Sequence, residues 1–538
     1  MQKVTVLFFV TLLLTVLGTT TQAARYTLTT AGAGSAQTVG NWNTGGVGGG
    51  GTAATNFTTT GDTFYVAPAT NGVVSGAWAF GNSGSASTVT LIVDGSLTIN
   101  SGNTLTLQQR NGGISRMTVN GTITFSGTAN QLVGTIAGSG SAANNTFALS
   151  NGATLSTVNA NGITGASASI NTTNLTATLN TGANYTFNGA SAQVTTGMPT
   201  TVNNLTINNA SGVTRGAATI INGTLTQTSG ALANGGFLVT VNGTHIAGSN
   251  VVSGTGGYTL GSGASFSTSH VSGVNGNITA SGTKTFNTNN NFTFNGGSAQ
   301  VTGTFMPTSI AALTISNTSG VTLSQNASAS GAVTVNSSCT LDASTFTLSA
   351  GSYTNNGIIQ FGGASNGVAI SSGTVQYSLA SGGQTIASGT YNNLTLSNSS
   401  NTNTAGGNLT VNGTLTTTAG GTFNMGVNSL SVTTVSHSGI LQTQNGSATP
   451  ISSGKTWGGT VQYSSTTGGQ TIANGTYNNL TLNNSSNTNT TNGNIAVSGT
   501  LTTTTGGTLN MGVNSLSVST VSHSGILQTQ NGSATPIS

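Results

Sequence analysis

Apolar and polar residues alternate along most of this chain in short segments separated by turn residues. One such phrase recurs as VDGSLT at 93–98, VNGTIT at 119–124, INGTLT at 221–226, VNGTLT at 411–416 and VSGTLT at 497–502. Alternation with a period of two is typical of a strand with one buried face, so Val, Leu and Ile are expected to face a core and Thr to face solvent. Helices are not expected, because Thr, Ser, Asn and Gly are poor helix formers and no apolar stripe has helical spacing.

The Asn-Gly or Asp-Gly pair inside the phrase predicts a tight turn, since these residues tolerate positive φ. The pair could join two antiparallel strands as a hairpin. It could instead form the corner of a coil in a solenoid. The flanking segments are very short and no long partner strand follows, which favours the corner.

Residues 373–538 contain two consecutive copies of one sequence repeat. GTVQY at 373–377 returns at 459–463, an offset of 86 residues, and residues 373–452 differ from 459–538 at 13 of 80 positions. Leu409 is replaced by Ile495, which keeps the apolar character, whereas Leu379 is replaced by Ser465 and is predicted to lie in a loop. Repetition of this kind predicts a quasi-one-dimensional stack of units.

A more divergent repeat precedes it. The segment 184–214 resembles the segment 291–322, so its copies start at Asn184 and Asn291. This longer period exceeds that of the close repeat by about one coil, so we expect the units to contain five and four coils. The spacing from Leu394 to Leu415 equals the spacing from Leu409 to Leu430, and each pair is expected to stack in one core.

Residues 1–23 are typical of a secretory signal peptide, with Lys3, a short apolar run at 4–17 and the small-x-small cleavage motif Thr21-Gln22-Ala23. The apolar run is short for a membrane span, and a membrane anchor is the alternative. No later segment is apolar enough to cross a bilayer, so we expect the mature chain to be exported whole.

Four regions are predicted. The signal peptide is followed by an N-terminal β-rich capping region with the first coils at 24–112, which contains Trp42 and Trp78. A β-solenoid with the divergent repeat is expected at 113–372, and one with the two close repeats at 373–538. The second copy stops where the first continues into another unit, so a fragment of a longer protein is expected.

Composition adds constraints on partners. Charged residues make up 2% of the chain, against about 25% in ordinary domains. The apolar fraction of 35% and the small net charge of +4 oppose disorder. The seven Lys and Arg residues are scattered, which excludes a basic patch for nucleic acid. Cys339 is the only cysteine, so no intrachain disulfide is possible, and a small buried side chain is expected there.

GTVQY, the QTI segment at 384–386, TYNNLTL at 390–396 and the VNGTLT phrase resemble the repeat regions of large secreted surface proteins of the Bacteroidota type. The segments GNWN at 40–43 and GDTFYV at 61–66 also look like the start of such proteins. The resemblance covers most of the mature chain. It implies a right-handed parallel β-helix, export, and an adhesin-like or structural role at the cell surface or outer membrane. Such proteins usually end in a C-terminal sorting domain, which has no counterpart in these residues.

Candidate catalytic groups are sparse. Glycoside hydrolysis needs two carboxylates at one bond, and a lyase needs clustered acids for calcium. Asp62, Asp94 and Asp342 are the only acids and are far apart in sequence. Asp94 occupies the turn position that Asn fills in other phrases, Asp62 is predicted in a strand-entry turn, and Asp342 has no acidic companion. An enzyme is therefore not expected.

The histidines do not form a predicted metal site. His437 and His523 occupy the same repeat position, and His245 and His270 are isolated. Without nearby acids or thiols, a solvated or core-edge role is expected for them. The sequence thus predicts no catalytic residue, no metal and no cofactor, and it identifies no ligand-binding residue.

Two functions remain. The first is a secreted or cell-surface structural or adhesive rod whose wall of Thr, Ser and Asn, with Tyr377, Tyr391 and their copies, makes many weak contacts with glycans or cells. The second is ice binding by outward Thr ladders such as Thr414-Leu415-Thr416 and Thr500-Leu501-Thr502. The simpler explanation of those threonines is that Thr suits the outer face of a strand. A polysaccharide-active enzyme is the least expected alternative, and the oligomeric state is not predicted.

Overall fold

The computed structural model describes residues 23–30, 34–59, 61–81, 88–110, 113–137, 145–380, 383–484, 487–530, 532 and 537–538. Of the predicted signal peptide, only Ala23 lies within these residues. They form short β-strands, one five-residue α-helix, α2 (Gly273–Asn277), and one 3-10 turn, η2 (Val39–Asn41), so the expected all-β class is confirmed. No helix in this described part is long and apolar enough to cross a membrane.

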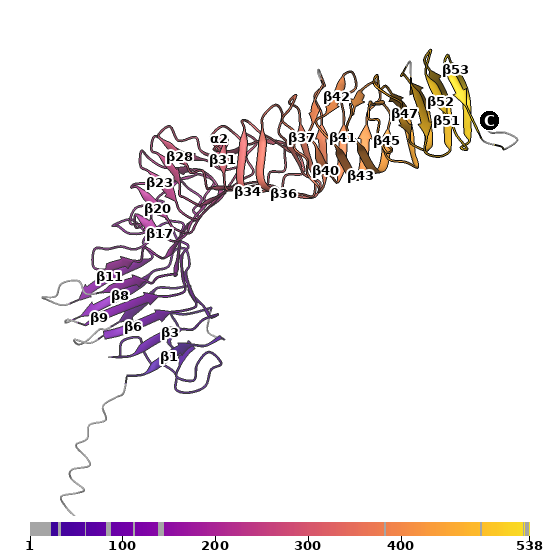
Figure 1. Cartoon of the computed structure of the whole chain (residues 1–538). Coiled ribbons are helices and arrows are strands. Elements are labelled where there is room, and N and C mark those ends of the chain that lie inside the picture. The colour runs from indigo at the N-terminus through magenta and orange to yellow at the C-terminus, as the bar shows by residue number, and fades with distance from the viewer. Residues whose placement is uncertain are drawn as a thin grey trace, which may run out of the picture. The chain divides into compact units, whose positions relative to one another are not determined.

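The chain divides into two compact units (Figure 1). The first contains Met1–Gly243, Val252–Tyr258 and Ala280–Thr283, and the second contains Thr244–Val251, Thr259–Thr279 and Lys284–Ser538. Each unit is a solenoid-like stack of mainly parallel strands, as the repeats predicted.

In the first unit, strands from successive coils pair in parallel. The best-aligned series is β7 (Ser96–Ile99), β10 (Thr122–Phe125), β13 (Thr154–Thr157) and β15 (Asn184–Phe187). Leu97, Ile123 and Leu155 lie opposite one another in this series and are completely buried. Inward apolar side chains therefore stack directly on those of the coil before, and the core is a continuous column.

The second unit repeats this arrangement. In its close repeat many hydrogen bonds between neighbouring coils join groups 20 or 21 positions apart, as between Thr417 and His437 and between Thr414 and Asn393. β41 (Asn393–Leu396), β43 (Leu409–Thr417) and β45 (Leu430–His437) pair in sequence.

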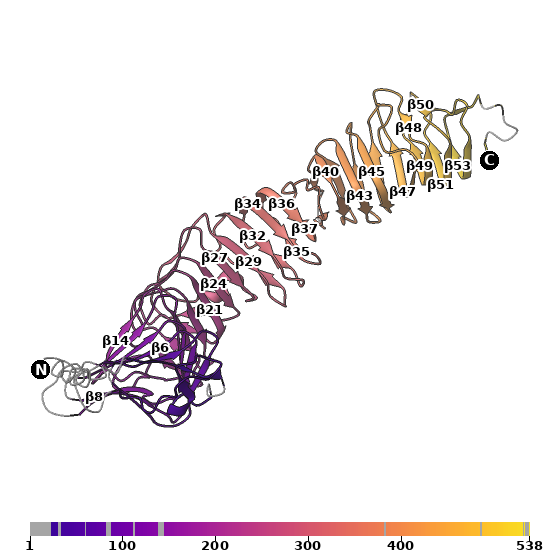
Figure 2. The same ribbon diagram turned by 90° about the horizontal axis from the view of Figure 1, so that it is seen from below.

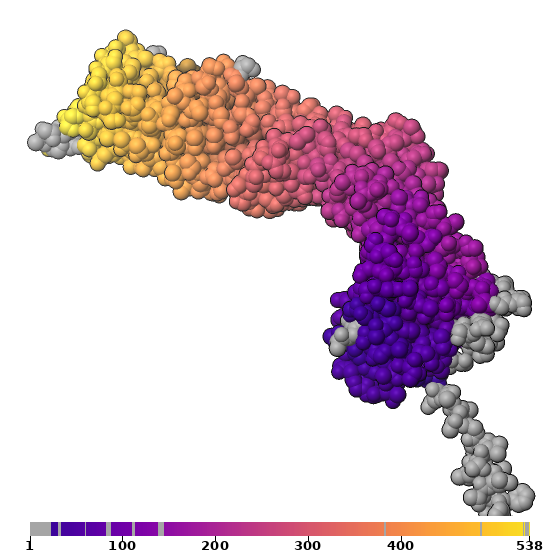
Figure 3. Space-filling model, turned by 180° about the vertical axis from the view of Figure 1, so that it is seen from behind, coloured from indigo at the N-terminus to yellow at the C-terminus, as the bar shows by residue number. Residues whose placement is uncertain are grey.

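This pairing places Leu394 opposite Leu415 and Leu409 opposite Leu430. All four leucines are buried, so the core pairs predicted from their equal spacing are confirmed. In Figure 2 the strands from β40 (Gly389–Tyr391) to β53 (Leu516–His523) lie side by side, and Figure 3 shows one face of the same region in orange to yellow.

The close repeat does not contain a whole number of coils. β38 (Thr374–Tyr377) pairs with β41, whereas its copy, residues 460–463 of β47 (Lys455–Tyr463), pairs with β46 (Ile440–Thr443) and β49 (Gly475–Leu482) in a different sheet. Since each coil contributes strands to three faces, one copy of the repeat advances the chain by four coils and one further face. The expected four coils are thus corrected, and the second copy is turned by one face relative to the first. Leu379 follows β38 outside any strand, as predicted.

The Asn-Gly corners have a different cause from the predicted one. Asn120-Gly121 joins β9 (Ile114–Val119) to β10, and these strands belong to different sheets, so the pair is a corner and not a hairpin. Positive φ is not the reason for the glycine, because Gly121 is not among the positive-φ residues. A Cβ atom on Gly121 would lie 2.0 Å from the carbonyl oxygen of Gly95 in the preceding coil. Glycine is required because the corners of neighbouring coils touch.

The first described coils contain an aromatic cluster. β1 (Arg25–Leu28) pairs in parallel with β3 (Thr63–Val66) and, on its other edge, antiparallel with β2 (Trp42–Asn43). The buried Trp42 ring lies 5.4 Å from the ring of Phe64 and 6.1 Å from that of Trp78, between ring centroids. These large rings fill the interior where the aliphatic columns begin.

A buried glutamine recurs at the corners of both units. In each case the side-chain Oε1 accepts a hydrogen bond from a backbone N–H four or five residues earlier, and Nε2 donates to carbonyls of the preceding coil. The residues are Gln131, Gln193, Gln300, Gln384 and Gln470, each at most 2% exposed. Backbone groups that turn inward at a corner have no ladder partner, so these amides supply the pairing that burial requires.

We predict that Gln470→Met destabilises its coil by about 3 kcal/mol, because the Ser465 N–H and the carbonyls of Thr443 and Asn445 lose their partner in a buried site. Hydrogen exchange of the amides in β47 and β49 measures the loss locally. Gln462→Met, at an outward position of β47, is the matched control and should change exchange very little. Equal effects of the two substitutions would contradict the role given to Gln470.

Candidate functional site

The three aspartates remain apart in the structure. Asp62 immediately precedes β3, Asp94 follows β6 (Thr88–Val93) at a corner, and Asp342 ends β35 (Thr340–Asp342). In the part of the chain that the structure describes, no group of three or more His, Cys, Asp or Glu side chains could hold a metal ion. Each of the three acids thus lies at the end of a different strand.

Asp94 lies at the predicted turn and also links neighbouring coils. Its carboxylate accepts hydrogen bonds of 2.8 Å from the Tyr65 hydroxyl and 2.8 Å from the Asn120 amide. The bond to Asp94 raises the pKa of Tyr65, because a phenolate would lie against the carboxylate. The guanidinium of Arg25 lies 3.9 Å from the centre of the Tyr65 ring. This outer chain of contacts links the corners of neighbouring coils.

Two histidines lie in the core, contrary to the expectation of solvated or core-edge positions. His245 is completely buried, with its ring edge-on to Phe266 at 4.9 Å between centroids. Burial lowers its pKa to about 3, so the ring is neutral at physiological pH. His437 is 4% exposed, and its Nδ1 lies 2.7 Å from the Thr417 hydroxyl.

The other two histidines are more accessible. His523, the copy of His437, keeps the equivalent contact with the Thr503 hydroxyl at 2.6 Å but is exposed. His270 is half-buried, and its Nδ1 accepts a hydrogen bond from the Ser272 N–H. Within the described ranges, none of the four belongs to a group of three or more His, Cys, Asp or Glu side chains that could hold a metal ion.

The tyrosines expected on the outer wall are in the core. Tyr377 and Tyr391 are completely buried, and their hydroxyls lie 3.1 Å apart. Their copies Tyr463 and Tyr477 are buried in the same way. The alternating pattern contained this information, since Tyr377 falls in step with the inward Val375. These side chains cannot contact a glycan, and the expectation that they do is wrong.

Cys339 is 2% exposed, as predicted for a small core side chain. Its burial raises the pKa of the thiol, which makes the thiolate less available at neutral pH. This residue is part of the core and adds no reactive group to the surface.

Outward side chains of the first unit form a regular polar array. One column, in register over consecutive coils, is Thr98, Thr124, Ser156, Thr186, Thr206 and Thr226. Its members are half-buried except Ser156, which is buried and donates a hydrogen bond to Asn188. A second column beside it is Ser96, Thr122, Thr154 and Asn184. Paired strands lie about 4.8 Å apart, so hydroxyl groups repeat at that spacing. We refer to these two columns as the Thr/Ser array.

Sequence reasoning missed the Thr/Ser array because its members are separated by unequal intervals along the chain, and only the alignment of coils reveals it. The two threonine ladders that it did identify are shorter. Thr416 lies between Thr395 and Ser436, and Thr502 lies between Thr481 and Ser522. They also belong to different sheets, so they do not form one flat surface.

Two shallow grooves lie on the second unit. One, of about 300 Å³, is lined by Thr322, Thr340, Asp342 and Gln360, among others. Asp342 lies between Thr322 and Gln360 of the adjoining coils, and its Oδ1 accepts a 2.7 Å bond from the Ser344 N–H. This groove offers hydroxyl, amide and carboxylate groups on one small surface.

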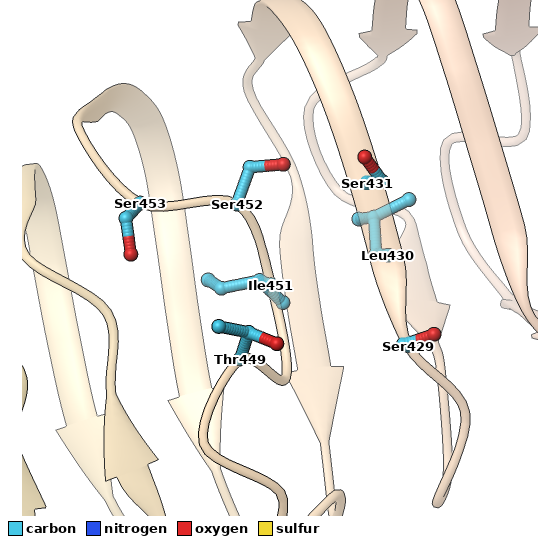
Figure 4. Close-up of a pocket in the computed structure, with 7 residues that line it drawn as sticks. All are labelled: Ser429, Leu430, Ser431, Thr449, Ile451, Ser452 and Ser453. Atoms are coloured by element: carbon cyan, nitrogen blue, oxygen red, sulfur yellow. The ribbon is translucent and has the colours of Figure 1, made fainter.

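The other groove, of about 320 Å³, separates β45 from the segment that follows β46 (Figure 4). Its lining residues are Ser429, Leu430, Ser431, Thr449, Ile451, Ser452 and Ser453. Leu430 and Ile451 are buried, so the exposed groups are mainly hydroxyls. Both grooves therefore present neutral hydrogen-bonding groups, with Asp342 as the only charge.

In comparisons with known proteins, no family model, no curated protein and no solved structure matches this chain.

We predict that His245 reduces stability in mild acid. The unfolded state binds a proton below pH 6.5, but the folded state does so only near pH 3, so stability falls with decreasing pH between these values, by up to about 1.4 kcal/mol per pH unit. His245→Leu should flatten that slope in urea unfolding measured from pH 7 to pH 4. His523→Leu, at an exposed position, is the control variant. An unchanged slope in His245→Leu would contradict the assignment.

Proposed function

We propose that this protein is a secreted structural or adhesive β-helix of the bacterial cell surface that contacts glycans or other cells through many weak polar interactions. The observation that supports the proposal is the Thr/Ser array, a neutral hydrogen-bonding surface repeated coil after coil. Hydroxyl and amide groups both donate and accept hydrogen bonds, as sugar hydroxyls do. Individually weak contacts that repeat along one molecule gain strength by multivalency.

The proposal includes the handedness of the coils and a cap. Crossover connections between parallel strands are right-handed in about 98% of cases, so we take this solenoid to be right-handed. We assign the antiparallel β2 and the Trp42 cluster as the N-terminal cap. An antiparallel edge strand ends the parallel ladder and covers an edge that would otherwise be open.

The rotation of the close repeat supports contacts in several directions. Its two copies carry nearly the same outward residues, but on sheets that differ by one face. A surface feature of the repeat is therefore presented twice with different orientations. This arrangement suits a surface protein that has neighbours on more than one side. It is consistent with the proposal that the chain resembles the Bacteroidota surface repeats in function as well as in sequence.

We predict that the exported chain beginning at Ala24 binds a subset of neutral glycans on an array, with less than about a twofold change in signal between low and high salt, since screening acts on charges and this surface has few. The variant Thr124→Val/Thr186→Val/Thr206→Val removes three hydroxyls of the array and should reduce binding at least fivefold. Thr416→Val, on the second unit, is the control. Absence of any glycan binding would contradict the adhesive role.

Ice binding is the second candidate, because the sheet that carries the Thr/Ser array contains two Thr-x-Thr motifs, Thr122-Ile123-Thr124 and Thr224-Leu225-Thr226. An ice recrystallisation assay separates the two functions. Inhibition by the exported chain that is lost in Thr124→Lys would favour this candidate. Glycan binding without such inhibition would favour the adhesive role.

A further inference from the structure

The carboxylate of Asp62 is buried beside the predicted signal-peptide cleavage site. Asp62 is 4% exposed, and its Oδ1 accepts a 3.0 Å hydrogen bond from the backbone N–H of Ala24. The positively charged side chain nearest to Ala24 in sequence, that of Arg25, lies instead over the ring of Tyr65. Among the described residues no cation pairs with the Asp62 carboxylate, and the neutral Ala24 N–H offsets only part of the hydration that the carboxylate loses on burial.

Ala24 is the first residue after the motif Thr21-Gln22-Ala23. A signal peptidase hydrolyses the peptide bond between Ala23 and Ala24. The hydroxyl of water goes to the carbonyl carbon of Ala23, and the Ala24 nitrogen leaves as an amine that takes up a proton at neutral pH. The same nitrogen that donates one hydrogen bond to Asp62 thereby becomes an ammonium group with three donors.

We propose that Asp62 is the binding site for the α-ammonium group of processed Ala24, and that this ion pair secures the first strand of the stack. The inference rests on the proposed export of the chain. The unprocessed chain already holds the two atoms at hydrogen-bonding distance, so cleavage adds charge without requiring the backbone to move. Hydrogen bonds between two charged groups are shorter and about twice as strong as neutral ones.

The backbone on the other side of Ala24 is fixed as well. The Thr63 N–H donates to the Ala24 carbonyl at 2.9 Å, and Arg25–Thr27 pair with Thr63–Tyr65 in parallel. An N-terminus held in this way cannot swing into solvent without breaking the pairing of β1 with β3. Processing is thus expected to order the strand on which β2 and the Trp42 cluster depend.

The test is a double-mutant cycle that combines removal of the residues before Ala24 with removal of the Asp62 charge. Four proteins are compared: the chain beginning at Ala24 and the chain that retains Gln22-Ala23, each with Asp62 or Asp62→Asn. Hydrogen exchange of the β1 and β3 amides reports local opening, and exchange in β15 reports whether the rest of the unit is folded. We expect Asp62→Asn to lower protection in β1 at least tenfold in the processed chain and less than twofold in the extended chain.

A second variant keeps the sequence intact. Acetylation of the Ala24 amine retains an N–H at this nitrogen but removes its charge, so the acetylated protein should behave as the extended one. If Asp62→Asn has the same effect in all forms, the ammonium site is wrong. The intact mass of the secreted protein tests export separately. A mass that does not correspond to a chain beginning at Ala24 contradicts the predicted cleavage. The ammonium site is then judged by the mutant cycle alone, because its proteins are prepared with defined N-termini.

Discussion

The structure depends on contact between each coil and the next, in register and at the spacing of a β-sheet. Inward leucines pair with inward leucines along the core, as at Leu394 and Leu415, and neither coil alone would bury them. The same spacing forces the corners together, which is why Gly121 has no room for a side chain. Buried glutamines such as Gln470 then pair the backbone groups that the corners turn inward.

This constraint explains how much the sequence revealed. The equal spacing of apolar positions such as Leu409 and Leu430 predicted the core pairs correctly, because coil length and alternation are local properties. The direction in which a copy faces depends instead on the sum of many coil lengths, so the extra face in the close repeat was not anticipated. Glycine at the corners was recognised but explained by positive φ, since close approach to another coil cannot be seen in a single segment.

Other residues also divide into those that the pattern of one strand predicts and those that depend on how many coils align. Tyr377 follows the inward pattern of its strand, and its contact with Tyr391 is visible only in the structure. The Thr/Ser array consists of residues that are ordinary in each strand. It becomes a surface because irregular intervals between coils still return the same position to the same column, as Thr124 and Thr186 illustrate.

The extra face of the close repeat has a consequence for how such a chain can evolve. Adding one further copy would turn any later segment by a third of a revolution about the local axis, and adding three would restore its original azimuth after thirteen coils. Changes in copy number would therefore alter both the orientation of later segments about the solenoid axis and their distance along it. Duplication by threes would lengthen the protein and keep its surfaces aligned.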